Sequence, residues 1–271
     1  MIVFPNCKIN LGLHILGKRE DGFHNLETVF YPVPFKDALE LIPATNTDIE
    51  FTGTGLAVDG NAADNLCVKA YHLLKKDFRE IPAVKIHLHK AIPLGAGLGG
   101  GSADAAFMLK LLNEKFKLKL STDQLINYAQ QLGSDCPFYI INKPCFATGR
   151  GEMLEEITVD LSAYKMVLIN PGIHINTSWA FTNITPDLPV KSIKEIIQQP
   201  ISSWKDELKN DFETAVFTAH PAIKEIKEKL YSQGAIYAAM SGSGSTVFGF
   251  FNSTFDMNPF KNKNYFIKII N

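Results

Sequence analysis

The 271-residue chain lacks several features that would each define a class of protein. No run of 18 apolar residues is present, which argues against a membrane-spanning helix. The first residues have neither the charged segment nor the long apolar segment of a signal peptide. The four cysteines form no C-x-x-C pair, which is typical of free thiols in a reducing cytoplasm. A net charge of −1 gives no basic field for nucleic acid. We therefore expect a cytoplasmic protein that binds neither membranes nor nucleic acids.

Glycine, in contrast, is concentrated in one stretch. Five glycines fall within the seven positions from Gly95 to Gly101. The alternation of apolar and polar residues over 84–89 predicts a strand before them, and the mostly apolar residues 105–113 predict a buried helix after them, with Ser102 as its N-cap. A glycine loop that opens a helix combines free backbone N–H groups with the positive end of the helix dipole. This combination is typical of a phosphate site.

Three phosphate-loop patterns compete for this stretch. The Walker pattern ends in Gly-Lys-Ser/Thr, but no lysine follows these glycines. The dinucleotide pattern G-x-G-x-x-G is matched by Gly95, Gly97 and Gly100, with Glu114 near the place of a ribose-binding acid. The preceding strand argues against the dinucleotide pattern. Its residues alternate between apolar and polar, whereas a central parallel strand is apolar on both faces. The third pattern is Pro-x-x-x-Gly-Leu-Gly-x-x-Ser, which begins at Pro93.

The remaining chain predicts an α+β protein in two parts, with a boundary near residues 150–165. Alternation over residues 2–16 predicts a long strand with one polar face that carries Lys8 and Asn10. Asp64 is the predicted cap of a helix, and Ser121-Thr122-Asp123-Gln124 is the capping box of another. Later strands are predicted at 165–169, 246–251 and 265–270, later helices at 201–209 and 222–232, and an exposed loop at 252–264.

Three separated motifs resemble those of the GHMP kinases, a superfamily that includes galactokinase, homoserine kinase and mevalonate kinase. They are the segment from Pro5 to Leu13, the glycine stretch, and the segment from Ser241 to Ser245. The resemblance implies a two-domain GHMP kinase fold with the active site in the cleft between an ATP-binding and a substrate-binding domain. Residues 1–155 would form the N-terminal ATP-binding domain and residues 156–271 the C-terminal domain. ATP and Mg²⁺ are the implied cofactors.

Within this superfamily the match narrows to members that phosphorylate a small alcohol bearing a cytidine diphosphate group. The segment Gly17–Thr28, the triple glycine before Ser102, and the segment Gly133–Phe138 carry this closer resemblance. It implies transfer of the γ-phosphate of ATP to a hydroxyl group, in the non-mevalonate route to isoprenoid precursors. The expected partner is this small molecule alone, and the expected protein is a monomer or a weak homodimer.

The resemblance also assigns catalytic residues. Asp135 matches the family's catalytic aspartate, which would take the proton of the attacking hydroxyl. Lys8 would lie beside it, hold it ionised and contact the transferring phosphoryl group. From the residues alone, the favoured interpretation of Asp135 is an N-cap or turn residue before Pro137. Lys8 alone is interpreted as an exposed lysine on a strand.

Binding residues follow from the same resemblance. Asn10 would position substrate hydroxyls, Phe23 and Phe181 would cover the two faces of the cytosine, and His24 would hydrogen-bond its edge. The segment that would bind the triphosphate is Pro93, Leu94, Gly95, Ala96, Gly97, Leu98, Gly99, Gly100, Gly101 and Ser102. The weaker matches are Asn65 and Lys90 near the adenine, and Gly242 and Ser243 on the substrate side. The Mg²⁺ ligands are unknown, with Ser102 as a candidate.

Alternative functions stay open from the residues. One is a kinase for homoserine or a mevalonate-like alcohol, against which Phe23 and His24 argue. Others are a nicotinamide-dependent oxidoreductase that uses the glycine stretch and a non-catalytic nucleotide sensor, against which Lys8 and Asp135 argue together. Asp104 receives no role.

Overall fold

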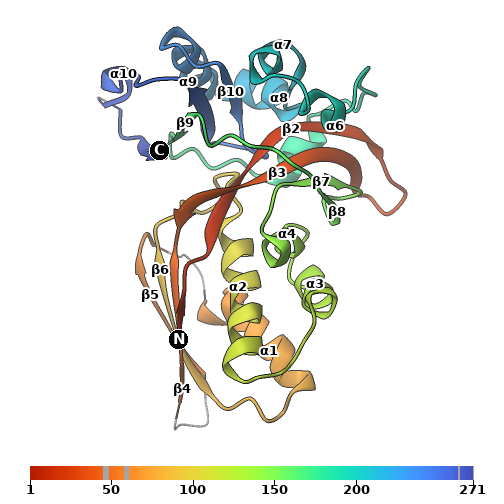
Figure 1. The fold of residues 1–271 in the computed structure, drawn as a ribbon, viewed down its shortest axis with the longest axis vertical. Helices are drawn as coiled ribbons and strands as arrows, with labels where there is room; N and C mark the ends of the chain where they lie inside the picture. The colour runs from red at the N-terminus through yellow and green to blue at the C-terminus, as the bar shows by residue number, and fades with distance from the viewer. Residues whose placement is uncertain (45–48, 58–60, 262, 271) are drawn as a thin grey trace. The chain divides into compact units, whose positions relative to one another are not determined.

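The computed structural model describes residues 1–44, 49–57, 61–261 and 263–270, and it has the predicted mixture of helices and sheets (Figure 1). The chain forms two compact units, neither of which is continuous in sequence. The first contains residues 1–7, 32–94 and 99–143, and the second contains residues 8–31, 95–98 and 144–271. These two units do not coincide with the two domains expected at residues 1–155 and 156–271. That division into domains stays a prediction.

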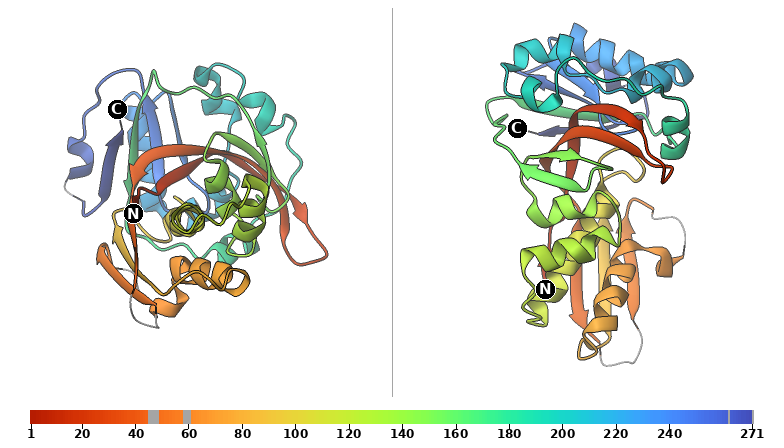
Figure 2. Two further views of the ribbon diagram at one scale, coloured as in Figure 1. Left: turned by 60° about the horizontal axis from the view of Figure 1, so that its bottom comes forward. Right: turned by 90° about the vertical axis from the view of Figure 1, so that its right-hand side faces the viewer.

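A four-stranded sheet with helices on one face forms the first unit (Figures 1 and 2). Its strands, in the order β1-β4-β6-β5, are Ile2–Val3, Ala38–Pro43, Val84–Lys90 and Glu50–Gly55. Strand β5 is parallel to β6, and the other pairs are antiparallel. The helices are η1 (Ala62–Asp64), α1 (Leu66–Asp77), α2 (Gly100–Lys115), α3 (Thr122–Gln130) and α4 (Cys136–Ile141). The strand predicted at 84–89 is confirmed, because Val84, Ile86 and Leu88 are buried in alternation.

The two histidines of β6, His87 and His89, hydrogen-bond to the neighbouring strand β5. His87 hydrogen-bonds to the hydroxyls of Thr52 and Thr54 on β5, and His89 bonds to Thr54, at 2.8 to 3.0 Å. In the part of the chain that the structure describes, no three His, Cys, Asp or Glu side chains gather into a metal-binding group. His87 and His89, which lie two positions apart on one face of β6, therefore have no third metal ligand among the described residues.

Helix α1 begins one residue later than predicted, because its N-cap is Asn65 and not Asp64. Asp64 ends η1, and it is the side chain of Asn65 that accepts the Cys67 N–H at 2.9 Å. Asn and Asp cap helices about equally well, so the sequence pattern could not choose between these neighbours.

The N-cap predicted at Ser102 is wrong. Helix α2 begins at Gly100, and Gly99 is its N-cap with φ of 68°. Glycine reaches this left-handed conformation without a Cβ clash, so the loop turns directly into the helix. Ser102 therefore lies in the first turn of α2. The capping box of α3 is confirmed, with both hydrogen bonds between Ser121 and Gln124 present.

Two four-stranded sheets form the frame of the second unit, although residues 6–7 and 32–36, at the ends of two of their strands, are counted with the first unit. The first, in the order β2-β3-β7-β8, has strands Asn6–Lys18, His24–Lys36, Cys145–Thr148 and Met153–Glu156. The second, in the order β10-β11-β9-β12, has strands Tyr237–Met240, Val247–Phe251, Lys165–Asn170 and Phe266–Ile270. The helices are α5 (Thr177–Thr182), α6 (Ile193–Ile196), η2 (Ile201–Ser203), α7 (Trp204–Glu207), α8 (Phe212–Ala219), α9 (Pro221–Ser232) and α10 (Asn258–Lys261).

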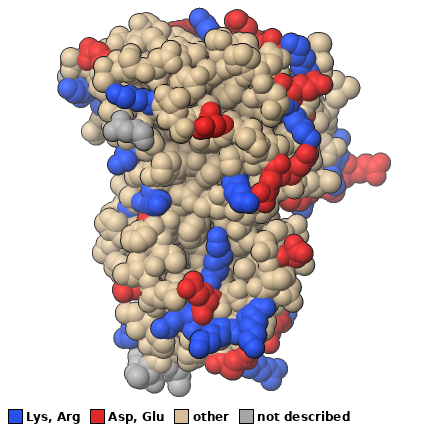
Figure 3. Space-filling view, viewed as in Figure 1, with Lys and Arg blue, Asp and Glu red and all other residues tan. Residues whose placement is uncertain are grey.

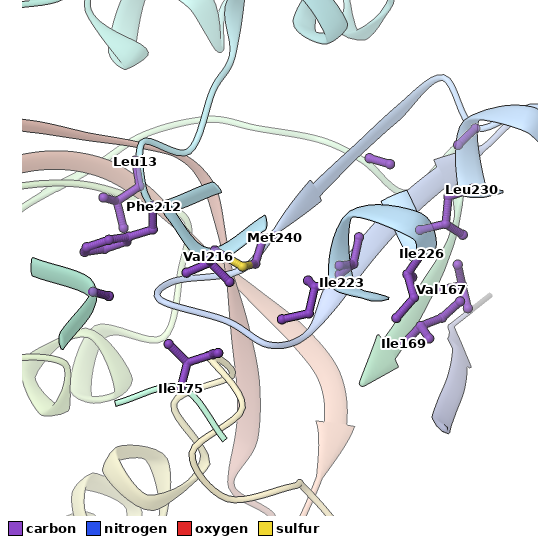
Figure 4. Close-up of a cluster of buried hydrophobic side chains, with 14 of the residues drawn as sticks. Leu13, Val167, Ile169, Ile175, Phe212, Val216, Ile223, Ile226, Leu230 and Met240 are labelled. Atoms are coloured by element: carbon purple, nitrogen blue, oxygen red, sulfur yellow. The ribbon is translucent and has the colours of Figure 1, made fainter. Parts of the chain in front are cut away.

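The core of this unit lies between α8, α9 and the second sheet (Figures 2 and 4). Buried aliphatic side chains from these helices and strands meet there, among them Val167, Ile169, Val216, Ile223, Ile226, Leu230 and Met240. Leu13 of β2 and Phe212 at the start of α8 join the same cluster. Strand β2, which carries the first motif, is thereby tied to the main core of the unit.

Several elements differ from the sequence prediction. Helices α5 and α8 occupy stretches for which no element was predicted, and the helix expected at 201–209 is divided into η2 and α7. The short α10 lies within the expected loop 252–264, whose residue 262 falls outside the described residues. At the start of α8, Asn210 Oδ1 accepts the Phe212 N–H at 3.0 Å, while its Nδ2 donates to two backbone carbonyls near residue 241. The start of α8 therefore depends on hydrogen bonds between residues that are far apart in the sequence.

Charges of both signs are interspersed on the face that Figure 3 shows. This distribution fits the net charge of −1 and offers no single basic surface on that face. Among the helices of the described ranges, none is long and apolar enough to cross a bilayer.

Candidate functional site

The polar face of β2 is buried. Lys8 and Asn10 are 3% and 2% exposed, so the interpretation of Lys8 as an exposed strand lysine is wrong. The Lys8 ammonium donates to Asn10 Oδ1 at 2.5 Å and lies 4.9 Å from the centroid of the Phe30 ring. Asn10 Nδ2 in turn donates to the Thr28 hydroxyl at 3.0 Å. A buried cation needs such partners, and its charge is weakly screened by solvent.

Residues of all three motifs meet at this point of the second unit. The Ser241 hydroxyl donates to the Gly97 carbonyl at 2.7 Å and accepts the Asn10 N–H at 3.2 Å. Gly242 lies beside them, because a Cβ added to it would stand 3.3 Å from Asn10 Oδ1. The Lys8 N–H also donates to the Leu98 carbonyl at 3.0 Å. The structure thus brings together Lys8, Asn10, Gly97 and Gly242, which the sequence assigned to one site, and adds Ser241 as their link.

Gly97 has no room for a side chain. Its φ is 75°, and an added Cβ would stand 2.0 Å from the Ser241 carbonyl oxygen. We expect Gly97→Ala to lose about 3 kcal/mol or more of stability from backbone strain and this backbone clash, and to lower Tm by about 6 °C or more. Differential scanning fluorimetry measures it. Gly172→Ala is the matched control, because Gly172 has the same φ of 75° and nothing within 4 Å of the added Cβ. Equal losses in the two variants would contradict the role of the close approach.

In the first unit, the start of α2 adjoins the start of α4. The first backbone N–H groups of α2 have no partner within the helix, and they carry the positive end of its dipole. The Ser102 hydroxyl, in the first turn, lies near the thiol of Cys136 and lowers the pKa of that thiol. Burial raises the pKa of that thiol to about 12, against the opposing effect of Ser102, so Cys136 is a neutral structural group.

Asp135 immediately precedes Cys136 and is half-buried. It occupies the N-cap position of α4, but its side chain makes no capping hydrogen bond. The capping role that the sequence left open for it is therefore wrong. Through Cys136 and Ser102, the chain places the Asp135 backbone beside the first turn of α2. A carboxylate in this place can accept a proton from a group bound at the helix start.

A cavity of about 330 Å³ lies within the first unit. Apolar side chains form much of its wall, namely Phe51, Leu66, Leu88 and Leu94. Both predicted adenine residues, Asn65 and Lys90, also line it, together with Gly101 and Asp104. The size and the mostly apolar wall with a few polar groups are typical of a small-ligand site. The structure thus brings Asn65 and Lys90 to one cavity beside the start of α2.

Lys90 makes an ion-pair cluster that the sequence did not indicate. Its fully buried ammonium donates to Asp37 Oδ2 and, at 2.7 Å, to Asp104 Oδ2. Burial raises the pKa of Asp104 to about 7, with Lys90 opposing the shift and Asp37 adding to it. Burial alone would lower the pKa of Lys90, but the two carboxylates raise it on balance, so the lysine stays charged. We call Asp37, Lys90 and Asp104 the Lys90 cluster.

Two of the residues predicted to bind the cytidine, His24 and Phe181, contact each other in the second unit. The rings of His24 and Phe181 are stacked, with centroids 4.9 Å apart and an interplanar angle of 16°, and Phe181 also packs edge-on against Phe212. Burial and the nearby Lys18 charge lower the pKa of His24, so its imidazole is neutral at pH 7 and has one donor and one acceptor nitrogen. Such a surface suits an aromatic base with donors and acceptors on its edge.

Phe23 has a partner that sequence reasoning missed. Its ring is 51% exposed, and the Arg150 guanidinium lies 4.7 Å from its centroid. The loop around it is ordered by Asp21, which accepts the Phe23 N–H at 3.1 Å and pairs with Arg19 at 2.9 Å. Arg150 stands between two glycines, and this is the one signal that marks a turn there. The last predicted substrate residue, Ser243, hydrogen-bonds to the Thr177 hydroxyl at 3.0 Å.

The comparisons with known proteins identify the family of the chain. Residues 65–143 match the model of the GHMP kinases N terminal domain, and residues 192–264 match that of the GHMP kinases C terminal. The chain is 55% identical over 254 residues to a 4-diphosphocytidyl-2-C-methyl-D-erythritol kinase of Bacteroides fragilis, with 93% of this chain and 92% of the relative covered. It is 56% identical over 253 residues to the enzyme of that name from Bacteroides thetaiotaomicron, with the same coverage.

A solved structure is similar as well. The crystal structure of a 4-(cytidine 5'-diphospho)-2C-methyl-D-erythritol kinase superimposes with a TM-score of 0.77 at 31% identity, covering 92% of this chain and 89% of that one. The fold class expected from the three motifs is confirmed by these matches. They also overturn the alternative of a nicotinamide-dependent oxidoreductase.

Proposed function

The chain belongs to the GHMP kinases, and from this membership we propose that it uses ATP to phosphorylate the 2-hydroxyl of 4-diphosphocytidyl-2-C-methyl-D-erythritol, giving the 2-phosphate and ADP. It is a small-molecule kinase, and ATP is the phosphoryl donor expected of its family. The reaction belongs to the non-mevalonate route to isoprenoid precursors, and we place it in the cytoplasm. The observation that carries the proposal is the convergence of Lys8, Asn10, Gly97 and Gly242, drawn from three distant motifs.

Nucleotide binding is assigned to residues 93–102, which we call the glycine segment, and to the cavity beside it. The apolar wall of the 330 Å³ cavity suits the adenine, and Asn65 and Lys90 are among its polar lining residues. The backbone N–H groups of residues 95–102 suit the triphosphate, because a helix start carries unpaired donors and positive potential. Helix α2, with 16 residues, is long enough for a full dipole at that start.

We also propose Mg²⁺ as the cofactor that travels with ATP. Mg²⁺ keeps much of its coordination from phosphates and water and needs few protein ligands. The half-buried Ser102 hydroxyl, in the first turn of α2, is the candidate among the residues that we assign to the triphosphate. The ion would neutralise charge on the phosphates.

The chemistry is assigned to Asp135 and Lys8. The substrate hydroxyl oxygen attacks the γ-phosphorus, the bond from that phosphorus to the bridging oxygen of ADP breaks, and the hydroxyl proton passes to the Asp135 carboxylate. The buried Lys8 ammonium supplies positive charge that stabilises the transferring phosphoryl group. Asn10, which accepts from Lys8 and donates to Thr28, fixes the position of that ammonium.

The cytidine end of the substrate is assigned to Phe23, His24 and Phe181. We expect Phe181→Leu to raise KM for the cytidyl substrate by about 10- to 100-fold, because base–aromatic stacking contributes about 1–3 kcal/mol. Leucine keeps apolar volume against Phe212, so KM for ATP and the folded state are expected to change little. Steady-state kinetics with each substrate varied in turn measures the split. A rise confined to KM for ATP would contradict the assignment of this ring to cytidine.

The proposed function is tested by ADP release with Mg²⁺-ATP and four acceptors in parallel. These are diphosphocytidyl-methylerythritol, methylerythritol phosphate, homoserine and mevalonate. Turnover of the cytidyl acceptor alone supports the proposal. Turnover of homoserine or mevalonate instead would keep the kinase and overturn the roles of Phe23, His24 and Phe181.

A further inference from the structure

The Lys90 cluster occupies an unusual place, since it joins the two ends of the glycine segment within the first unit. Lys90 is the last residue of β6, just before the segment, and Asp104 lies in α2, just after it. One ammonium therefore bridges the strand that enters the segment and the helix that leaves it. The third member of the cluster, Asp37, lies between β3 and β4. It also binds the backbone that leads from β6 into the glycine segment. Asp37 Oδ1 accepts the N–H groups of Ala91 and Ile92 at 2.6 and 2.8 Å.

The packing at the exit side is equally tight. A Cβ added to Gly100 would stand 2.9 Å from both Lys90 Nζ and Ile92 Cγ2. The first turn of α2 thus lies directly against the ammonium and against the residue before Pro93. These contacts connect the two ends of the segment, whereas glycines by themselves would leave their spacing free.

The cluster is built at a cost that packing alone does not require. Two carboxylates share one ammonium, all three side chains are at most 3% exposed, and Asp104 Oδ1 has no hydrogen-bond partner among the described residues. Replacing such a buried ionic group by apolar residues is often neutral or stabilising. The other titratable neighbours, Cys67 on α1 and Tyr139 on α4, have their pKa values raised by burial and stay neutral, so they supply no further countercharge.

We propose that the Lys90 cluster is a positioning device for nucleotide binding: it fixes the distance between the end of β6 and the start of α2, and so presents the N–H groups of the glycine segment to the phosphates. The inference rests on the proposed ATP site. It also changes the role of Lys90, whose side chain is fully buried and already paired with two carboxylates. The lysine acts on the nucleotide through the backbone on either side of the segment, and Asp104 is its partner on the helix.

The test compares variants that loosen the cluster with one that loosens α2 elsewhere. Asp104→Asn keeps the shape and removes the charge, and Lys90→Met removes the ammonium. Asn113→Ala is the matched control, because Asn113 lies near the other end of α2 and exchanges two hydrogen bonds with Leu120. For each protein, Tm, the Kd of Mg²⁺-ADP by calorimetry, and kcat and KM for both substrates are measured.

We expect Asp104→Asn to weaken ADP binding and raise KM for ATP by about tenfold or more, with kcat at saturating ATP and KM for the alcohol within about threefold of wild type. Lys90→Met is expected to act in the same direction and more strongly. Asn113→Ala is expected to lower Tm without moving either nucleotide constant.

Two results would overturn the inference. One is ADP binding within twofold of wild type in folded Asp104→Asn, whatever its Tm. The other is an Asn113→Ala variant whose ADP binding weakens in proportion to its own loss of stability. Failure of the proposed function would be a separate result: wild-type protein would bind ADP without turning over the cytidyl alcohol. In that case, the comparison of ADP binding among the variants would still test the role of the Lys90 cluster.

Discussion

Asp135→Asn is expected to lower kcat by about 10²- to 10⁴-fold, which is the usual contribution of a positioned general base. Asparagine keeps the shape of the side chain and cannot take the hydroxyl proton. The Asp135 side chain has no capping duty in α4, so the substitution should leave Tm within a few degrees of wild type. KM for ATP should change by less than about threefold, because the backbone of α2 presents the proposed phosphate donors. Rapid-quench or coupled measurement of ADP release, with both substrates varied, checks each part.

Asp123→Asn is the control for this substitution. Asp123 lies in the first turn of α3, is exposed, and has no place in the proposed site. It should keep wild-type kcat. If Asp135→Asn retained more than a tenth of wild-type kcat, Asp135 would only orient the hydroxyl, because phosphoryl transfer through a loose transition state needs little proton removal before the P–O bond breaks.

The residues that sequence reasoning found share one property, which is that each lies in a local pattern. The glycine stretch, the alternating strand at 84–89 and the capping box at Ser121 are all read within a window of a few residues. Lys8, Asn10 and Asp135 were placed by motifs of the same short length. The structure confirms the strand and the capping box, and the family matches confirm the fold.

The residues that it missed depend on partners far along the chain. Asp37 and Lys90 are 53 positions apart, and Ser241 is 144 positions from Gly97. No periodicity or spacing connects such pairs, so the Lys90 cluster and the link between Asn10 and the glycine stretch become visible only in three dimensions. Asp104 did carry one signal, because a carboxylate next to a nearly all-apolar helix must be paired or neutral when it is buried.

Burial explains the remaining errors. The alternation of β2 correctly separates two faces, but it cannot tell a solvated polar face from a buried one, and Lys8, Asn10 and His14 are all at most 7% exposed. The start of α2 was placed too late because a serine is a common cap, whereas glycine in the left-handed conformation needs no side chain to begin a helix.

Lys8→Met is expected to lower kcat by about 10²- to 10³-fold, which is the usual loss when one preorganised charge or donor is removed from a transition state. Methionine retains an apolar stem over the Phe30 ring and loses the ammonium. Removing a buried charge also removes its desolvation cost, which offsets the loss of the hydrogen bond to Asn10, so Tm should stay within a few degrees. Steady-state kinetics and thermal melting measure the two effects. Lys36→Met, at the exposed end of β3, is the control and should keep wild-type kcat.

The double variant Lys8→Met/Asp135→Asn tests whether the two residues act as a unit. They belong to different compact units, so their coupling has to come from kinetics. If the ammonium acts on the same transferring group whose proton Asp135 accepts, the two losses are not additive, and the double variant should be about as slow as the slower single variant. Multiplied losses would mean that each residue contributes independently, and the assignment of Lys8 as the partner of Asp135 would then be wrong even if both single variants were slow.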